Sequence, residues 1–345
     1  HGLDGNAKIS DGRDLVDALT DSLPASCAAF NELLERGVAV GGAGRVAHTL
    51  ALAPQGANGA QVRELVGTLV ERGGDCCGVA ADQRGALHLA VAAGDARLTA
   101  RLLDLGADPN ARDVQGATPL HQALQLDACN AVPVLKYLVA AGANPAMASA
   151  NGETPLGLAL ARREPEFAYW LNWAGWRLPI RRLRGNDLAA AASVGDLDAL
   201  ERLLALGLPL ESEDAQGATP LIRAAGCGHT ALVVRLLELG ADTAHVAHSG
   251  IHCLAAAVSA KREAVVRTLL SNGVVADTRM AGGGTALTVA AALGEIRTAE
   301  ALLEAGDHAN ASDDHGTTPL HSVAQYAFAR GDAATAQERF GLLLK

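Results

Sequence analysis

The side chains with the clearest potential for metal chemistry lie close together at His245, His248, His252 and Cys253. Their order, H-x2-H-x3-H-C, offers nitrogen and sulfur donors of the kind that bind zinc. Structural zinc sites usually pair their ligands across a longer loop, whereas we expect here a turn followed directly by the start of a helix. A metal-binding protein or an enzyme that uses this cluster is therefore an alternative, and we prefer the interpretation without a metal.

No other group of residues indicates catalysis. Asp and Glu are scattered, and no Ser-His-Asp or Cys-His order stands out. The glycine run at 282–284 follows no expected strand and precedes no lysine, as a phosphate-binding loop would require. We therefore predict no catalytic residue, no cofactor and no metal ligand.

A second unusual segment combines aromatic and basic side chains. All three tryptophans and five of the ten aromatic residues lie between Phe167 and Trp176. Tyr169 and Trp173 are four residues apart and so share one face of an expected helix. Tyr, Trp and Arg are typical of binding hot spots, but large rings also fill gaps at an irregular junction, and both interpretations stay open. The candidate contact residues here are Tyr169, Trp173, Trp176, Arg177, Arg181 and Arg182.

The element that positions these segments is a repeated unit, which is most regular at residues 214–242. Thr219 and Pro220 predict the cap and the first position of a helix. Glycines at 226 and 228 break that helix, and Leu and Val at helical spacing predict a second helix that ends at Gly240. Such a unit cannot bury its apolar faces alone, so it needs copies on either side.

The copies are marked by a glycine after each second helix. These glycines are residues 37, 73, 106, 142, 175, 207, 240, 273 and 306, at intervals of 36, 33, 36, 33, 32, 33, 33 and 33 residues. Thr-Pro-Leu-His at 118–121 and 318–321 and Gly-Ala-Asp at 106–108 closely match the motifs of the ankyrin repeat family, which nearly the whole chain resembles. The resemblance implies an all-α, ankyrin-like solenoid of about ten helix-turn-helix repeats with a period near 33 and short β-hairpin-like fingers.

The repeats also suggest boundaries along the chain. We expect an N-terminal tail and then a single solenoid whose last repeat stops before its terminal glycine, as in a piece of a longer protein. The expected segments are the tail at 1–13, the solenoid at 14–345, degenerate repeats at 14–80, regular repeats at 81–175, the irregular aromatic and basic junction at 167–186, and further repeats at 187–345.

Composition restricts the kinds of partner. Hydrophobic residues make up 49% of the 345 residues but aromatic residues only 3%, so the expected core is Ala, Leu and Val. The formal net charge of -10 argues against nucleic acid or an anionic membrane as the main partner. Six cysteines without framework spacing favour reduced thiols in the cytoplasm. No apolar run reaches the roughly 20 residues that span a membrane.

The family resemblance also implies where a partner binds, because fingers and first helices line the concave face of such repeats. We predict a non-catalytic protein-protein interaction scaffold or recognition module that binds another protein or another domain of the same protein, in an oligomeric state that the sequence does not indicate. An autoinhibitory or targeting module of an enzyme outside this sequence is an alternative. The candidate contacts on fingers and first helices are Val114, Gln115, Asn151, Glu153, Gln216, His248, His315 and Tyr326.

Overall fold

The computed structural model is helical and divides into two compact units. The N-terminal unit holds the chain up to Trp173 together with Leu178–Leu183, and the C-terminal unit holds Ala174–Arg177 together with the chain from Arg184. The boundary between the two units lies inside the junction expected at 167–186. The structure describes residues 15–23, 25–36, 45–52, 57–72, 74–75, 78–80, 83–162, 164–330 and 341, so the expected tail and nearly all of the end of the last repeat lie outside it.

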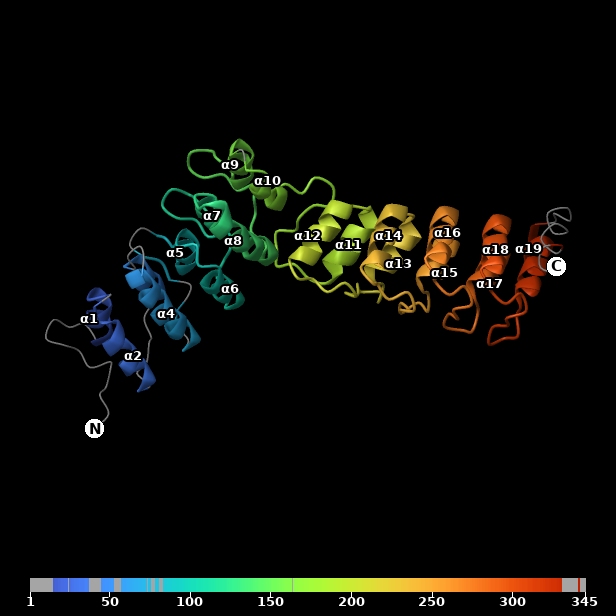
Figure 1. Cartoon of the computed structure of the whole chain (residues 1–345), viewed down its shortest axis with the longest axis horizontal. Helices are drawn as coiled ribbons and strands as arrows, with labels where there is room; N and C mark the ends of the chain where they lie inside the picture. The colour runs from blue at the N-terminus through green and yellow to red at the C-terminus, as the bar shows by residue number, and fades with distance from the viewer. Residues whose placement is uncertain are drawn as a thin grey trace. The chain divides into compact units, whose positions relative to one another are not determined.

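The N-terminal unit consists of helix pairs that follow one another, and in most of them first helices pack on first helices and second helices on second helices (Figure 1). Its described helices are α1 (Leu15–Asp21), α2 (Cys27–Glu35), α3 (Arg45–Ala51), α4 (Ala57–Glu71), α5 (Ala86–Ala92), α6 (Ala96–Asp104), α7 (Pro119–Ala123), α8 (Ala128–Ala141), α9 (Pro155–Ala161) and α10 (Pro165–Leu171).

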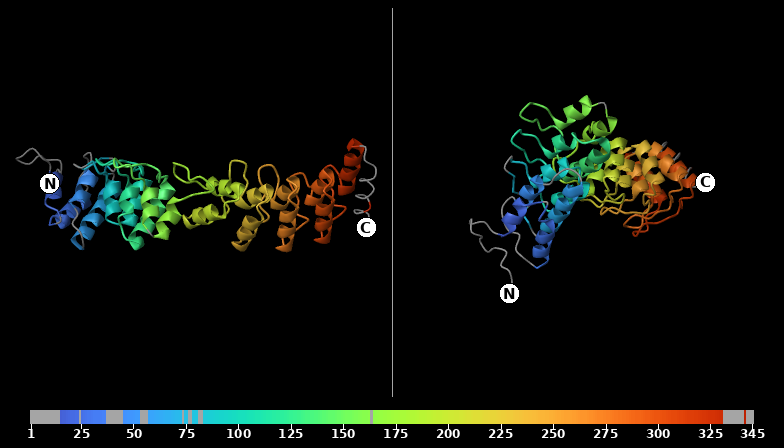
Figure 2. Two further views of the ribbon diagram at one scale, coloured as in Figure 1. Left: turned by 90° about the horizontal axis from the view of Figure 1, so that it is seen from above. Right: turned by 60° about the vertical axis from the view of Figure 1, so that its left-hand side comes forward.

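The C-terminal unit repeats the same arrangement more regularly, with its helix pairs standing side by side (Figures 1 and 2). The loops that precede α13, α15, α17 and α19 leave the stack at the same edge (Figure 1). The described helices of this unit are α11 (Asn186–Val194), α12 (Leu197–Ala205), α13 (Pro220–Cys227), α14 (Thr230–Glu238), α15 (Cys253–Ser259), α16 (Glu263–Ser271), α17 (Ala286–Leu293), α18 (Ile296–Glu304) and α19 (Pro319–Arg330).

The helix ends follow from local sequence signals. Thr219 precedes Pro220, the first residue of α13, and the Thr154 hydroxyl accepts the Gly157 N–H at 3.0 Å at the start of α9. Gly142 ends α8 in the left-handed conformation, with φ of 95°. A Cβ on Gly142 would lie 2.3 Å from the Arg181 carbonyl carbon, so glycine also lets the chain of residues 178–183 pass close to α8.

The core of each unit consists of small and branched aliphatic side chains, as the composition predicts. Leu135 and Leu138 are fully buried in the N-terminal unit, as are Leu200 and Val233 in the C-terminal unit. Helices α11 and α13 pack through alanines, which permit the close approach that short stacked helices need. The all-α repeat fold predicted from the sequence is confirmed. None of the described helices has the length and apolar character to cross a membrane.

Short fingers precede the first helices of the regular repeats. Six described fingers, residues 113–117, 149–153, 214–218, 247–251, 280–284 and 313–317, each close by a bond from the first backbone N–H to the fifth carbonyl, at 2.8–3.1 Å. The fourth residue of each is a glycine with φ between 68° and 79°, which only glycine adopts without strain. Within the described residues these fingers contain no strand, and a single isolated β-bridge joins Val79 and Gly85.

Candidate functional site

In several fingers an acidic side chain at the first position accepts hydrogen bonds from the backbone of the same finger. In the finger at 214–218, the Asp214 Oδ1 atom accepts the N–H groups of Gln216 and Ala218 at 2.9 and 3.0 Å. Burial opposes ionisation of Asp214, but these donors and the Arg223 guanidinium outweigh it and hold the pKa of its carboxyl below the ordinary value. Asp113 and Asp313 bond the equivalent amides of their own fingers.

Neighbouring fingers are joined through their backbones. In the C-terminal unit, the His248 N–H donates to the Gln216 carbonyl at 3.0 Å. The Ala281 N–H donates to the Gly250 carbonyl at 3.2 Å, and the Asp314 N–H donates to the Gly282 carbonyl at 2.9 Å. In the N-terminal unit the Ala150 N–H donates to the Gln115 carbonyl at 2.8 Å. The four fingers of the C-terminal unit therefore form one continuous row.

The tips of these fingers face solvent. The second and third residues are exposed in all six described fingers, and Val114 reaches 61% exposure. The predicted contact residues Val114, Gln115, Asn151 and Glu153 are exposed in the N-terminal unit, and Gln216, His248 and His315 are exposed in the C-terminal unit. Tyr326 lies in α19, but its side chain is outside the described structure.

The histidines near the fingers connect consecutive repeats. The His121 Nδ1 atom accepts the Thr118 N–H, and its Nε2 donates to the Glu153 carbonyl, both at 3.0 Å. His252, at the cap position of α15, also connects two repeats, because its Nε2 donates to the Thr278 carbonyl at 3.1 Å. Burial lowers the pKa of His252, which keeps the ring neutral and able both to donate and to accept.

The side chains of the possible zinc cluster point to different partners. The His245 Nε2 atom donates to the Gly217 carbonyl at 2.9 Å, and His248 is exposed with its ring against the same glycine. The buried Cys253 thiol faces the Thr243 carbonyl at 3.5 Å, and burial raises its pKa to about 12, which disfavours a thiolate ligand. No three described His, Cys, Asp or Glu side chains converge in a group suited to a metal ion.

The aromatic segment of the junction is mostly packed inside. Phe167 is completely buried, and Trp170 and Trp176 are 5% and 8% exposed. Trp173 is half-buried, and its ring N–H donates to the Trp170 carbonyl at 2.9 Å. Tyr169 alone among the five aromatic residues of 167–176 is exposed, at 40%. Trp176 therefore exposes little surface to a partner, and its burial favours the interpretation in which large rings fill the space at an irregular repeat.

The junction residues divide between the two units. In the N-terminal unit Arg181 and Arg182 are exposed, and the Arg182 guanidinium pairs with Asp104. In the C-terminal unit Arg177 is exposed, and the Trp176 N–H donates to the Asp196 carboxylate at 2.6 Å. Tyr169, Trp173, Arg181 and Arg182 therefore belong to the N-terminal unit, and Trp176 and Arg177 belong to the C-terminal unit.

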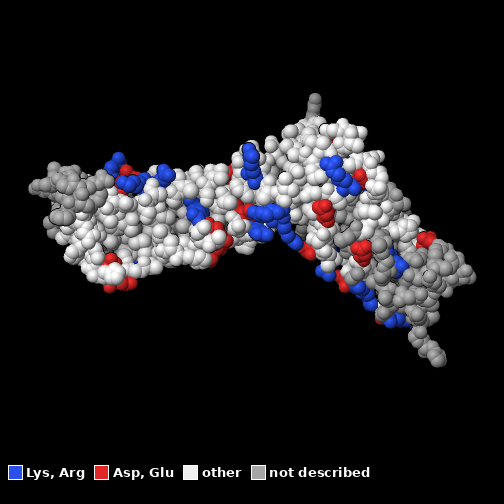
Figure 3. Space-filling model, turned by 180° about the vertical axis from the view of Figure 1, so that it is seen from behind, with Lys and Arg blue, Asp and Glu red and all other residues white. Residues whose placement is uncertain are grey.

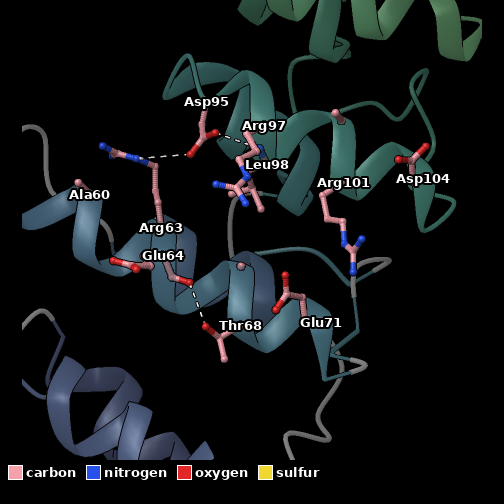
Figure 4. A pocket seen from close by; sticks show the side chains of 12 residues that line it. Ala60, Arg63, Glu64, Thr68, Glu71, Asp95, Arg97, Leu98, Arg101 and Asp104 are labelled. Atoms are coloured by element: carbon pink, nitrogen blue, oxygen red, sulfur yellow. Dashed lines mark hydrogen bonds and ion pairs between the residues drawn. The ribbon is translucent and has the colours of Figure 1, made fainter.

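A groove between α4 and α6 was missed by the sequence interpretation. It measures about 730 Å³, and its walls carry arginine and acidic side chains from both helices (Figure 4). The signal was present in the repeat alignment, since Arg63 and Gly67 occupy positions where other repeats have Glu263 and Glu201. The family resemblance directed the search to the fingers and first helices, whereas this groove lies between two second helices.

Comparison with known proteins agrees with the observed repeats. The family model described as "Ankyrin repeats (3 copies)" matches residues 53–148, 87–172, 188–280 and 254–335, which together cover most of the chain.

Relatives share the repeats within longer proteins. The chain is 32% identical over 139 residues to the ankyrin repeat and KH domain-containing protein mask-1 of Caenorhabditis elegans, 40% of this chain and 5% of that protein. It is 27% identical over 330 residues to the E3 ubiquitin-protein ligase KEG of Arabidopsis thaliana, 82% of this chain and 20% of that protein. It is 27% identical over 240 residues to the mouse B-cell lymphoma 3 protein homolog, 68% and 46% respectively. The matched region is less than half of each relative.

Proposed function

Because the chain belongs to the ankyrin repeat family, whose repeats bind other proteins, we propose that it is a non-catalytic recognition module whose fingertips contact a partner protein. The observation that carries this proposal is the finger row of the C-terminal unit. Its backbone is fixed by bonds within and between fingers, while the second and third residues of each finger remain exposed. A fixed frame of this kind lowers the ordering cost of binding, because side chains are presented in place.

The chemistry of the fingertips fits a protein surface. Gln216, His248 and His315 offer hydrogen-bonding groups, and no Lys or Arg occupies the second or third position of a described finger. On the face seen in Figure 3, basic and acidic side chains are scattered apart from one small basic cluster, and most of the described surface is uncharged. A partner held by many phosphate contacts requires a basic surface, so we favour a polar protein segment.

A combined Gln216→Ala, His248→Ala and His315→Ala variant is expected to lower partner recovery at least tenfold, because it removes the exposed groups without touching the finger backbone. The measurement is quantitative mass spectrometry of proteins captured from cells that express the chain. The matched control replaces Asp198, Glu300 and Glu304, which are exposed on second helices of the same unit. Equal loss in both variants, or equal retention, contradicts binding through the fingers.

A second candidate function is the targeting or inhibition of a catalytic region in the same protein. The observation in its favour is that KEG, by its name an E3 ubiquitin-protein ligase, contains a similar region as a fifth of its length. In that case the partner of the fingertips is a segment encoded in the same reading frame. Adding the isolated repeat chain to its own catalytic region, and measuring activity with the fingertip variant as control, distinguishes this function from recognition of a separate protein.

A further inference from the structure

Gln216, at the third position of the finger 214–218, is held by an arginine from the helix that follows. The Arg223 Nη2 atom on α13 donates to the Gln216 side-chain oxygen Oε1 at 2.6 Å. The Arg223 Nε atom donates to the Asp214 carboxylate at 2.5 Å, and Asp214 accepts two backbone N–H groups of its own finger. The Gln216 side chain is therefore held by a chain of hydrogen bonds that begins at the finger backbone.

This contact determines which way the Gln216 amide points. A guanidinium group carries only N–H donors, so the atom that faces Arg223 must be the amide oxygen. The Nε2 nitrogen and its two N–H groups are then available on a residue that is exposed. Gln216 therefore offers donors at this fingertip, whereas a freely rotating amide can offer either a donor or an acceptor.

The chain contains a matched fingertip without the arginine. Residues 113–120 and 214–221 differ only at their second position, so Gln115 corresponds to Gln216. Gln115 is likewise exposed, and its finger closes by the same kind of bonds to Asp113. The position of Arg223 holds Gln122, Leu158, Ala256, Val289 and Ser322 in the other described fingers. An arginine at this position is therefore not needed to form a finger.

The charge around the fingertip restricts the acceptor that Gln216 can meet. Eight acidic residues and one arginine, a formal net charge of -7, lie in the segments that carry the fingers of the C-terminal unit, which are 207–219, 240–252, 273–285 and 306–318. Glu213, beside this finger, has a side chain that is 49% exposed, and Arg223 is already paired with Asp214. A carboxylate or phosphate of a partner would be repelled here, whereas an uncharged carbonyl would not.

We propose that Gln216, positioned by Arg223, donates a hydrogen bond to a main-chain carbonyl group of the partner protein. This inference rests on the proposed function, because it names the group that one fingertip of the C-terminal unit contacts. Main-chain carbonyls are uncharged acceptors that every residue of a partner carries. An amide that is already held in one orientation loses less conformational freedom on binding. The contact therefore selects for the path of the partner's backbone and not for a charged side chain.

Two substitutions of Gln216 test the direction of this hydrogen bond. Gln216→Ala removes the donors and is expected to lower recovery of the captured partner about threefold to tenfold. Gln216→Glu keeps the shape and the contact with Arg223 but offers only acceptors, so recovery is expected to fall at least tenfold and below that of Gln216→Ala. The measurement is quantitative mass spectrometry of the protein that the unmodified chain captures in cells. Gln115→Glu makes the same charge change at the matched fingertip and is expected to alter recovery less than twofold.

The positioning role of Arg223 is tested by the mobility of the Gln216 amide. Nitrogen-15 relaxation of side-chain amides is expected to show Gln216 more ordered than Gln115 in the unmodified chain. Arg223→Met keeps an unbranched side chain but no donor, and should make the Gln216 amide as mobile as that of Gln115. Thermal unfolding followed by circular dichroism checks the fold of this variant, and the comparison within the unmodified chain does not depend on it.

The inference is overturned if Gln216→Glu recovers the partner as well as Gln216→Ala or better, which would indicate a donor on the partner, such as a basic side chain. It is also overturned if Gln115→Glu causes the same loss, or if the two amides are equally mobile in the unmodified chain. Loss of the partner in the combined Gln216, His248 and His315 variant without loss in Gln216→Glu would contradict this inference alone. Recovery of no protein by the unmodified chain would contradict the proposed function as well.

Discussion

Replacing Phe167 by alanine is expected to lower the free energy of unfolding by about 3–5 kcal/mol, the usual cost of removing a buried aromatic ring. Phe167 is completely buried in α10, and the Arg162 guanidinium lies over its ring at 5.0 Å. The structure thus makes this ring a core residue of the N-terminal unit. All three tryptophans of the chain lie between Trp170 and Trp176, so tryptophan fluorescence during urea unfolding follows this region directly.

Tyr169 supplies the control in the same helix. Its ring packs edge-on against Trp170, with centroids 5.2 Å apart, but it is 40% exposed. Tyr169→Ala is therefore expected to cost about 1 kcal/mol or less. If both variants unfold like the unmodified chain, the aromatic segment is not core, and its interpretation as an open contact surface would be restored.

Replacing Asp307 by asparagine is expected to stabilise the protein at pH 7.5 by about 1–3 kcal/mol. Asp307 is 5% exposed, at a position where other repeats carry Ala107, Ala143 and Ala241. Its Oδ2 accepts the Leu287 N–H at 3.2 Å, but its Oδ1 has no hydrogen-bond partner. A charged carboxylate in that place is costly, and asparagine keeps an acceptor for Leu287 without the charge.

The same residue predicts an unusual pH dependence. Burial raises the pKa of Asp307 to about 6; the Leu287 N–H opposes this shift, and the neighbouring Asp277 adds to it. The folded protein therefore binds a proton more readily than the unfolded chain, whose carboxyl has its ordinary pKa near 3.8. This contribution to stability is complete below about pH 4 and is lost as the pH rises through 6.

Urea unfolding followed by circular dichroism at several pH values between 4 and 7.5 measures this contribution. In Asp307→Asn the difference from the unmodified chain should be largest at pH 7.5 and should shrink toward pH 4. Asp314→Asn, an exposed change in the adjoining finger, is the control and should show no such trend. A difference that is constant with pH would show that Asp307 does not titrate in the folded protein in this range.

The recurring sequence motifs allowed most of the helix positions to be predicted. Thr219 and Pro220 mark the start of α13, and Gly240 follows the end of α14. Such signals can be read from the sequence because capping residues, proline and glycine determine the backbone only of the few residues around them. The burial of Trp176 could not be predicted in this way. It depends on the path of the connection that brings the Trp176 N–H to Asp196, twenty residues further along the chain.

The partners that side chains find in neighbouring repeats also could not be predicted from the sequence. The spacing of His245, His252 and Cys253 made a metal site the less favoured interpretation, but the separate bonds of these residues to Gly217, Thr278 and Thr243 are seen only in the folded stack. The groove at α4 and α6 was the opposite case. Gly67 and Arg63 of this groove, at the registers of Glu201 and Glu263, could be found by aligning the repeats, but they lie outside the fingers and first helices on which the prediction was based.

Site-specific photocrosslinking tests the central claim, binding through the fingertips, most directly. A benzophenone amino acid in place of Gln216 or His248 is expected to capture a protein partner in cells, because both positions are exposed on the fixed finger row. The same amino acid in place of Glu300 or Glu304, exposed on α18, is expected to capture none. Crosslinks from α18 without crosslinks from the fingers would contradict the proposed function.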